Sequence, residues 1–500
     1  MRFAALMLAA ALATAAGPGG QPAAGAPAPP IDLFFAAAGS DERKARPALD
    51  EIARGWRDSY AAMIIDLARL MRAAPRDAGS DQTPGLAADD ATDFAGSRGG
   101  DTLDRAAAPI RRESIARRRL ISFLERQTKQ RFGDNLNAWR EWMWTLPAAP
   151  HPDYMRFKGA VYAQIDPRMA GFFRPDATSL IRLDEIDWGG VQVNGIPPLY
   201  YPKQLSATDA PYLRDSHIVF GVVINGEARA YPKRILAWHE MAIDRIGGVE
   251  MTIVYCTLCG TVIPYESRAG GQVRRFGTSG LLYRSNKLMF DEETLSLWST
   301  LEGRPVVGPL AGSDLQLTMH GVVTTTWGEW RAEHPTTTVL SLDTGHKRDY
   351  GEGAAYREYF STDDLYFRVS NTDTRLKKKD EVLALQVAPA GGGEPAAVAI
   401  AAALLKKNQV YHFEIGGRRF VALTTAQGAN RVFDAGSSNV RFVRLLGEHL
   451  VLDAEGEQWR WSEQALTRAN DETARLPRVP AHRAFWFGWY AQFPDTALIK

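Results

Sequence analysis

Val249-Glu-Met-Thr-Ile-Val-Tyr-Cys-Thr-Leu-Cys-Gly260 is the stretch around which the rest of this chain is organised. Apolar residues alternate with Glu250 and Thr252 along its first half, which is the period-two pattern of a half-buried β-strand. The strand then enters a turn that Gly260 permits. Cys256 and Cys259, the 2 cysteines of the 500-residue chain, both lie here. Because packing alone does not require two thiols at the end of a strand, the stretch predicts a reactive or ligand-binding site.

The N-terminus predicts export. Arg2 precedes an apolar run from Phe3 to Leu12, and Ala13-Thr14-Ala15 has the small-x-small pattern of a cleavage site. We therefore predict a signal peptide over residues 1–15 and a periplasmic or secreted protein without a membrane span after its removal. An uncleaved anchor is the alternative. Thiols outside the cytoplasm tend to be oxidised unless a metal binds them or a reductant keeps them reduced. The predicted compartment therefore affects the expected oxidation state of the two cysteines.

Charge excludes one class of partner. The 59 Lys and Arg residues balance 58 Asp and Glu residues, and basic residues are not interleaved with aromatic ones. Such a chain presents no phosphate-binding face, so nucleic acid is not an expected partner.

The first 148 residues predict a helical unit. The richness of residues 17–30 in Pro, Gly and Ala predicts a linker over 16–35. Apolar residues at three-four spacing from Leu49 to Leu70 predict one amphipathic helix, and further helices are expected over 112–127 and 134–144. Residues 77–104 lack any period and predict a disordered insert, so the helical unit is assigned to 36–148.

Short alternating segments replace helical periodicity after Pro150. Asn225-Gly226 separates two strand patterns and is a strong hairpin signal. A second hairpin is predicted around residues 291–294, and residues 327–333 predict a short helix that Pro335 closes. Together with the helical start, these elements predict an α+β fold.

Comparison of the chain with itself predicts an internal duplication. A shift of 169 residues places Ile246-Gly247-Gly248 on Ile415-Gly416-Gly417. A shift of 159 residues places Trp327, Trp330, Pro335 and Thr337 on Trp486, Trp489, Pro494 and Thr496. We therefore expect two related, mainly β units over 190–345 and 365–500. The 169-residue shift aligns Cys256, Cys259 and His239 with Thr425, Gly428 and Asn408. Because the second unit lacks the thiols and the imidazole, the site is expected in the first unit alone.

The two thiols allow three kinds of chemistry: metal binding, dithiol–disulfide cycling, or a static disulfide. His239 lies upstream, and Gly247-Gly248 would turn the chain back so that its imidazole meets the thiols; Met289 is a fourth candidate ligand. This set of soft donor atoms favours copper, and next zinc, as the bound metal. The predicted role is metal carriage or a metal-dependent redox step. Either role implies a redox or metal-delivery partner. The alternatives are a thiol–disulfide redox protein and a non-catalytic scaffold with a structural disulfide. The sequence does not decide whether the protein is an enzyme.

A second set of residues predicts a pocket. Ser279, Arg284 and Asn286 follow one another within Gly277-Thr-Ser-Gly-Leu-Leu-Tyr-Arg-Ser-Asn286 and are candidate cofactor-binding residues. A turn with its own hydrogen bonds is the alternative. Glu240 and Asp244 would lie one helical turn apart if that segment is helical, and would then support His239.

These motifs also carry a family resemblance. Asn225-Gly-Glu-Ala-Arg-Ala-Tyr-Pro232, Ile235-Leu-Ala-Trp-His-Glu240, Tyr255-Cys-Thr-Leu-Cys-Gly260 and Thr326-Trp-Gly-Glu-Trp330 occur in this order. Together with Gly195-Ile-Pro-Pro and the Phe276–Asn286 segment, they resemble domain-of-unknown-function family 3179, an exported bacterial and archaeal family. The resemblance implies Cys-Pro-Leu-Cys where this chain has Thr257, and it also implies the histidine and the methionine at positions 239 and 289. It implies no activity.

Overall fold

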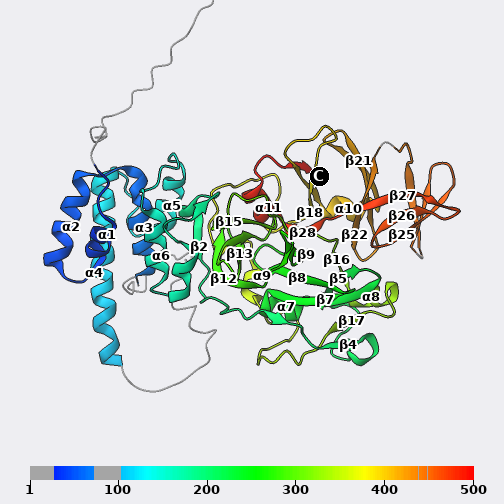
Figure 1. Cartoon of the computed structure of the whole chain (residues 1–500), viewed down its shortest axis with the longest axis horizontal. Helices are drawn as coiled ribbons and strands as arrows, with labels where there is room; N and C mark the ends of the chain where they lie inside the picture. The colour runs from blue at the N-terminus through cyan, green and yellow to red at the C-terminus, as the bar shows by residue number, and fades with distance from the viewer. Residues whose placement is uncertain (1–26, 72–102, 437, 448) are drawn as a thin grey trace, which may run out of the picture. The chain divides into compact units, whose positions relative to one another are not determined.

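The computed structural model describes residues 27–71, 103–436, 438–447 and 449–500, with side chains of α4 described from residue 114 onward. The predicted signal peptide over 1–15 lies outside these residues, as does nearly all of the predicted insert over 77–104. The chain divides into a helical unit that ends at Pro152 and a mainly β unit over Asp153–Lys500 (Figure 1). The α+β prediction is therefore confirmed.

The helical unit contains five α-helices among its described residues: α1 (Ile31–Ala38), α2 (Glu42–Arg54), α3 (Ala61–Leu70), α4 (Leu103–Thr128) and α5 (Leu136–Trp144). The last residues of the predicted linker are wrong, because α1 begins at Ile31, and Ile31 and Phe34 are buried although Pro, Gly and Ala dominate the residues before them. The single helix predicted from Leu49 to Leu70 is wrong. Gly55 caps the end of α2, and the chain resumes as α3. Trp56 in the break is buried, so the apolar spacing continues across it.

The first part of the β unit contains three main sheets. A five-stranded sheet has the order β16-β5-β6-β17-β4, a four-stranded sheet the order β3-β7-β8-β9, and a six-stranded sheet the order β1-β15-β14-β13-β12-β2. The strands of these sheets are β1 (Thr178–Ser179), β2 (Ile186–Trp188), β3 (Leu199–Tyr200), β4 (Gln204–Ser206), β5 (Ile218–Ile224), β6 (Glu227–Pro232), β7 (Met241–Ile246), β8 (Val249–Cys256), β9 (Thr261–Glu266), β12 (Phe276–Tyr283), β13 (Asn286–Asp291), β14 (Leu297–Ser299), β15 (Arg304–Gly308), β16 (Val323–Thr326) and β17 (Thr338–Leu340). Helices α6 (Tyr154–Tyr162), α7 (Lys233–His239) and α8 (Trp327–Glu333) belong to the same part.

The later part of the β unit contains two sheets. A four-stranded sheet has the order β28-β18-β19-β29, and an eight-stranded sheet the order β20-β21-β22-β27-β26-β25-β24-β23. The strands are β18 (Glu381–Val387), β19 (Ala396–Ala401), β20 (Val410–Ile415), β21 (Arg418–Thr424), β22 (Asn430–Gly436), β23 (Phe442–Gly447), β24 (Leu450–Asp453), β25 (Gln458–Trp461), β26 (Ala465–Arg468), β27 (Asp471–Val479), β28 (His482–Phe485) and β29 (Ala497–Ile499). Helix α9 (Arg357–Ser361) precedes these strands, and α10 (Ala402–Lys407) and α11 (Trp486–Gln492) lie among them.

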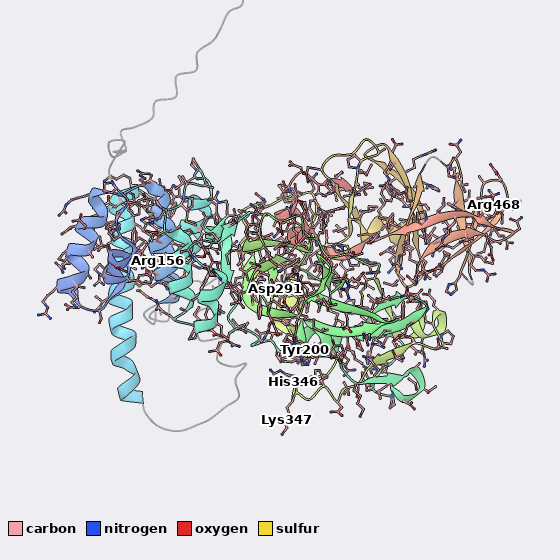
Figure 2. All side chains as sticks on the ribbon, in the orientation of Figure 1. Arg156, Tyr200, Asp291, His346, Lys347 and Arg468 are labelled. Atoms are coloured by element: carbon pink, nitrogen blue, oxygen red, sulfur yellow. The ribbon has the colours of Figure 1, made fainter. Side chains whose placement is uncertain are left out.

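Local patterns predicted these elements well. The Asn225-Gly226 hairpin is β5–β6, with both turn residues at positive φ, and α8 spans the residues predicted for it. The second hairpin joins β13 to β14, where Trp298 Nε1 donates to Asp291 Oδ2 at 2.9 Å (Figure 2 labels Asp291). This bond orients the core indole.

The half-buried character predicted for Val249–Cys256 is wrong. From Met251 onward β8 is buried. Strands β7 and β9 are hydrogen-bonded to its two edges, and a hydrophobic core lies against each face of the sheet. Ile253 belongs to one core and Val254 to the other, while Thr252 donates or accepts a hydrogen bond with Ser267 at 2.8 Å. The two thiols are therefore delivered to the interior.

Candidate functional site

The two thiols are adjacent and buried at the turn between β8 and β9. Cys259 N donates to Cys256 O at 3.2 Å, and Gly260 closes the turn at a φ of 62°. The turn brings Cys256 Sγ to 2.8 Å from Cys259 Sγ, and both cysteines are free thiols. Cys256 is 3% exposed and Cys259 is fully buried. Burial raises the pKa of Cys259 well above its ordinary value, and the hydrogen bond from Cys256 adds to this effect.

A strained turn faces the sulfur atoms. Arg284 and Ser285 connect β12 to β13 with positive φ angles of 48° and 64°, a conformation that is uncommon for residues other than glycine. Cys259 Sγ donates to the carbonyl oxygen of Ser285 at 3.2 Å. Backbone strain of this kind is often found at functional sites.

A buried ion pair lies beside the thiols. Lys287 Nζ is 3.3 Å from Glu240 Oε2 and donates to Glu240 O at 3.2 Å, while Tyr356 Oη donates to Glu240 Oε1 at 2.8 Å. Burial lowers the pKa of Lys287, and the charges of Glu240 and Cys256 oppose that shift. Glu240 itself adopts a φ of 54° at the end of α7. Buried charges cost desolvation energy, which the pairing of Lys287 with Glu240 offsets, and the ammonium also interacts electrostatically with Cys256.

Helix α11 covers the thiols from the later part of the chain. A Cβ atom on Gly488 would lie 3.1 Å from Cys259 Cβ and 3.4 Å from its Sγ, so glycine is needed for this close approach. Phe485 N donates to Cys259 O at 2.7 Å, and Asn286 Nδ2 donates to Gly488 O at 2.9 Å. The site therefore lies between the first and the later sheets of the β unit.

Two polar atoms at the site lack partners. Thr257 Oγ1, in the thiol turn, and Asn286 Oδ1, at the end of the opposing turn, are buried without a hydrogen-bond partner among the described residues. The Thr257 hydroxyl can donate a hydrogen bond and Asn286 Oδ1 can accept one. A small polar molecule that reaches the thiols would therefore have a donor and an acceptor nearby.

The structure does not bring His239 to the thiols. Its Nδ1 lies 2.8 Å from Pro197 O, and its Nε2 lies 2.5 Å from Tyr350 Oη. Tyr350 belongs to the loop after β17 that also carries His346, labelled in Figure 2, whose ring centroid lies 5.2 Å from that of His239. Burial lowers the pKa of His239 to about 4. Both nitrogens thus have partners outside the thiol turn.

Met289 is also separate from the thiols. It packs into the core that contains Met241, Ile263 and Trp298, whereas the cysteines belong to a core with Leu258 and Phe485. Within the described part of the chain, the only group of three His, Cys, Asp or Glu ligand atoms that lie within 4.8 Å of one another is Glu333, His334 and Glu463. The four predicted metal ligands are therefore not assembled into one sphere.

The predicted pocket residues make structural contacts. Ser279 Oγ donates to Leu288 O at 2.5 Å, and Arg284 forms an ion pair with Glu185 and donates to Ala491 O at 3.0 Å. Asn286 donates to Gly488 O, the residue of α11 that packs against Cys259.

Glu240 and Asp244 do not share a helix, so that prediction is wrong. Helix α7 ends at His239, and Asp244 lies in β7, where it pairs with Arg229 at 2.7 Å. The spacing allowed a helix, but the left-handed Glu240 ends it.

Sequence reasoning missed Lys287 and Tyr356. A charged residue at the start of the apolar run Leu288-Met-Phe290 was the available signal for Lys287. Tyr356 lies in the connection between the two predicted β units, where no pattern singled it out.

Comparison with known proteins identifies the family. The model of the protein family of unknown function DUF3179 matches residues 193–496, which is more than half of the chain. The chain belongs to the DUF3179 family. No curated protein and no solved structure matches it. The DUF3179 match includes the thiol turn, Lys287 and α11, so the whole candidate site lies within the family domain. Among the described residues, no helix combines the length and the apolar character needed to cross a membrane.

Proposed function

We propose that Cys256 and Cys259 form a dithiol–disulfide redox centre in an exported protein. The observation that carries this proposal is the 2.8 Å separation of the two sulfur atoms inside one four-residue turn. A disulfide bond is about 2.05 Å long, so a shift of about 0.8 Å would join them without rearranging the strands. Oxidation forms the S–S bond and releases two electrons and two protons.

The buried charges favour a reactive pair over an inert one. A thiolate is the nucleophile in disulfide exchange, and a nearby cation stabilises it. Lys287 interacts electrostatically with Cys256, and its ammonium is held in place by Glu240, whose carboxylate also accepts a hydrogen bond from Tyr356. This arrangement supports Cys256 as the attacking thiol and Cys259 as the thiol that completes the disulfide.

Burial restricts the reaction partner. Because Gly488 and Phe485 cover the turn, a folded protein would not reach the sulfur atoms without displacing α11. A small disulfide or a small thiol is therefore the proposed electron-exchange partner of the closed form.

A redox titration tests the proposal. The full chain would be equilibrated with mixtures of reduced and oxidised dithiothreitol, quenched with acid, alkylated and weighed by mass spectrometry. We expect a single two-electron transition with both thiols changing together. A Cys256→Ser variant should lose it, and a Met289→Leu variant serves as the matched sulfur-removal control that keeps it. Thiols that stay reduced under every mixture would contradict the proposal.

The static disulfide of a scaffold or interaction module is distinguished by the same titration. A structural disulfide would resist reduction until the protein is unfolded, whereas a redox centre should reduce in the native state. Comparison of native with denatured samples separates the two.

Metal binding stays a prediction, and the residues present do not fit it as a set. A zinc site needs two further ligands beside two thiolates, but both ring nitrogens of His239 are hydrogen-bonded elsewhere and Met289 lies in another core. Elemental analysis of untagged protein, beside Cys256→Ser/Cys259→Ser, decides the matter. A stoichiometric metal lost in the variant would establish the site.

We also propose that the two β units arose by duplication. The orders β16-β5-β6-β17 and β28-β18-β19-β29 match, with two antiparallel pairs and one parallel pair in each. Trp330 Nε1 donates to Thr337 Oγ1 at 2.9 Å, and Trp489 Nε1 donates to Thr496 Oγ1 at 2.9 Å. Superposition of the two units in an experimental structure tests this; unrelated paths beyond these elements would contradict it.

Export is proposed from the N-terminal sequence alone. Mass measurement of periplasmic or secreted material should show that residues 1–15 have been removed. The full mass in a membrane fraction would indicate an anchor instead.

A further inference from the structure

A single layer of chain covers the thiols on one side. Residues 341–380 connect β17 to β18 and contain, as described, the short helix α9 and no strand. Tyr359 and Val369 from this connection are buried in the core that holds both cysteines. Exposed residues of the same stretch include Arg357, Glu358, Asp363 and Asp364. We call residues 353–370 the lid segment, because solvent lies on one side of it and the thiol core on the other.

Side chains hold the lid segment in place. Tyr359 Oη donates to Leu258 O at 2.7 Å, and Tyr356 Oη donates to Glu240 Oε1 at 2.8 Å. Lys379, which follows the segment, donates to Tyr359 O and lies over the Tyr359 ring at 3.5 Å from its centroid. Among the described residues, no strand of any sheet pairs with the segment. A few side-chain hydrogen bonds and a small apolar contact therefore keep it closed.

The cover on the other side of the thiols is anchored more firmly. Phe485 belongs to β28 and is paired in the ladder with β18, and Trp486 and Trp489 of α11 are buried in a separate core. Displacement of α11 would break this ladder and expose two indoles, which bury large areas. Displacement of the lid segment would expose Tyr359 and Val369 and break no ladder. The lid segment is therefore the part of the cover that opens at the lower cost in free energy.

The two ends of the lid segment differ. Gly353 adopts a φ of 70°, and no atom lies within 4 Å of a Cβ built on it, so this glycine serves the backbone conformation and not packing. At the other end, Asn371 Nδ2 donates to Ala491 O at 3.0 Å and ties the chain to α11. This arrangement suits a segment that turns about Gly353 while its far end stays attached.

We propose that the lid segment opens to admit small reactants to the thiols and that Tyr359 is its latch. Leu258, whose carbonyl accepts the latch bond, lies between Cys256 and Cys259 in the sequence of the turn. Closure therefore seats the latch on the reactive pair itself. The identity of the reactant, a small disulfide or thiol, rests on the proposed redox function, whereas the opening of the lid segment does not.

Native-state alkylation tests the latch. The full chain would be reduced with dithiothreitol, separated from it and treated with iodoacetamide, and the modified fraction would be followed by intact-mass spectrometry. We expect Tyr359→Phe to speed alkylation about three- to tenfold, because the loss of one hydrogen bond raises the open population by that order.

Tyr265→Phe is the matched control. It also removes a buried phenol that donates to a backbone carbonyl, from Tyr265 Oη to Thr300 O at 2.9 Å, but in a core without the cysteines. The alkylation rate should stay at the wild-type value. Equal acceleration by Tyr359→Phe and Tyr265→Phe would mean that the thiols are reached through global unfolding, and would overturn the proposal.

Lys379→Met provides a second variant of the latch. It removes the donor to Tyr359 O and the 2.6 Å hydrogen bond from Lys379 Nζ to Thr362 O, so it should speed alkylation as well. Lys378→Met removes the neighbouring exposed lysine and should not. Melting temperatures measured in parallel identify a variant that has lost its fold. An unchanged rate in both folded latch variants would contradict the proposal.

Hydrogen exchange measured by mass spectrometry locates the moving element. Tyr359→Phe should speed exchange in peptides of the lid segment and leave peptides of residues 485–492 unchanged. Faster exchange over 485–492 alone would assign the opening to α11 and overturn the proposal. Exchange does not require reduced thiols, so the lid segment can be confirmed even if the redox titration fails. Normal redox cycling without any change in exchange or alkylation would refute the lid segment alone.

Discussion

At the residue scale, Gly488 controls how closely α11 approaches the thiols. An alanine Cβ there would lie 3.1 Å from Cys259 Cβ. Overpacking of this kind costs about 1–3 kcal/mol, so we expect Gly488→Ala to lower the free energy of unfolding by that order. Urea denaturation measures it.

The control for Gly488→Ala is Gly391→Ala, because nothing lies within 4 Å of a Cβ at Gly391. It should leave stability almost unchanged. If both variants unfold at the same urea concentration, the contact of α11 with Cys259 is looser than described. Native alkylation of the thiols should also be faster in Gly488→Ala, because the helix is displaced.

His482 should make stability depend on pH. It is 3% exposed, neither ring nitrogen has a hydrogen-bond partner among the described residues, and burial lowers its pKa to about 4. The folded-state pKa is below the unfolded value, so its contribution is complete above about pH 6.5 and is lost as the pH falls toward 4. The loss for a shift of this size is about 3 kcal/mol.

His482→Val isolates this effect, since the 159-residue shift matches His482 with the core residue Val323. His239 and His334 also have pKa values lowered to about 4 by burial, but they are unchanged in the variant. We expect the stability difference between variant and wild type to grow as the pH falls from 7 to 4.5. A difference that is constant across this range would contradict the assignment.

At the scale of elements, the Lys287–Glu240 pair joins β13 to the end of α7. Lys287→Met would leave the Glu240 carboxylate buried with Tyr356 as its side-chain partner. Removal of one member of a buried pair costs about 3–5 kcal/mol, so a large loss of stability is expected. Lys287→Met/Glu240→Gln should recover part of it, because no charge then remains buried.

A solvent-exposed ion pair provides the control for the Lys287→Met and Lys287→Met/Glu240→Gln variants. Arg174 and Asp176 form an ion pair with side chains that are 54% and 72% exposed. Arg174→Met should change stability by less than about 1 kcal/mol. A Lys287→Met effect as small as that of Arg174→Met would mean that the buried pair is hydrated in solution.

At the scale of the whole molecule, the two β units should fold as one body. Phe485 and Phe487 pack in the core that contains Cys256 and Cys259, and Arg431 pairs with Glu333, so each unit completes the other's interior. We expect a fragment of residues 153–500 to unfold cooperatively in urea. A fragment of residues 365–500 should not, because it exposes these side chains; cooperative unfolding of that shorter fragment would contradict the expectation.

The sequence by itself determined the local elements. Asn225-Gly226 predicted a hairpin because both positions require positive φ, and alternation with β-branched residues predicted β8. The turn that places Cys256 next to Cys259 was equally predictable, since a Cys-x-x-Cys spacing within one turn leaves few other arrangements. These signals are local, because the turn residues and the alternation act through neighbouring residues of the chain.

Only the tertiary structure decided what surrounds the thiols. Lys287, Tyr356 and Gly488 reach the site from segments that are distant in sequence, and the same folding directs His239 toward Pro197 and Tyr350. No spacing encodes these contacts, because the packing of β-sheets against one another depends on the summed burial of many side chains. The local pattern therefore specified where the thiols are, and the packing of the two β units decided which groups act on them.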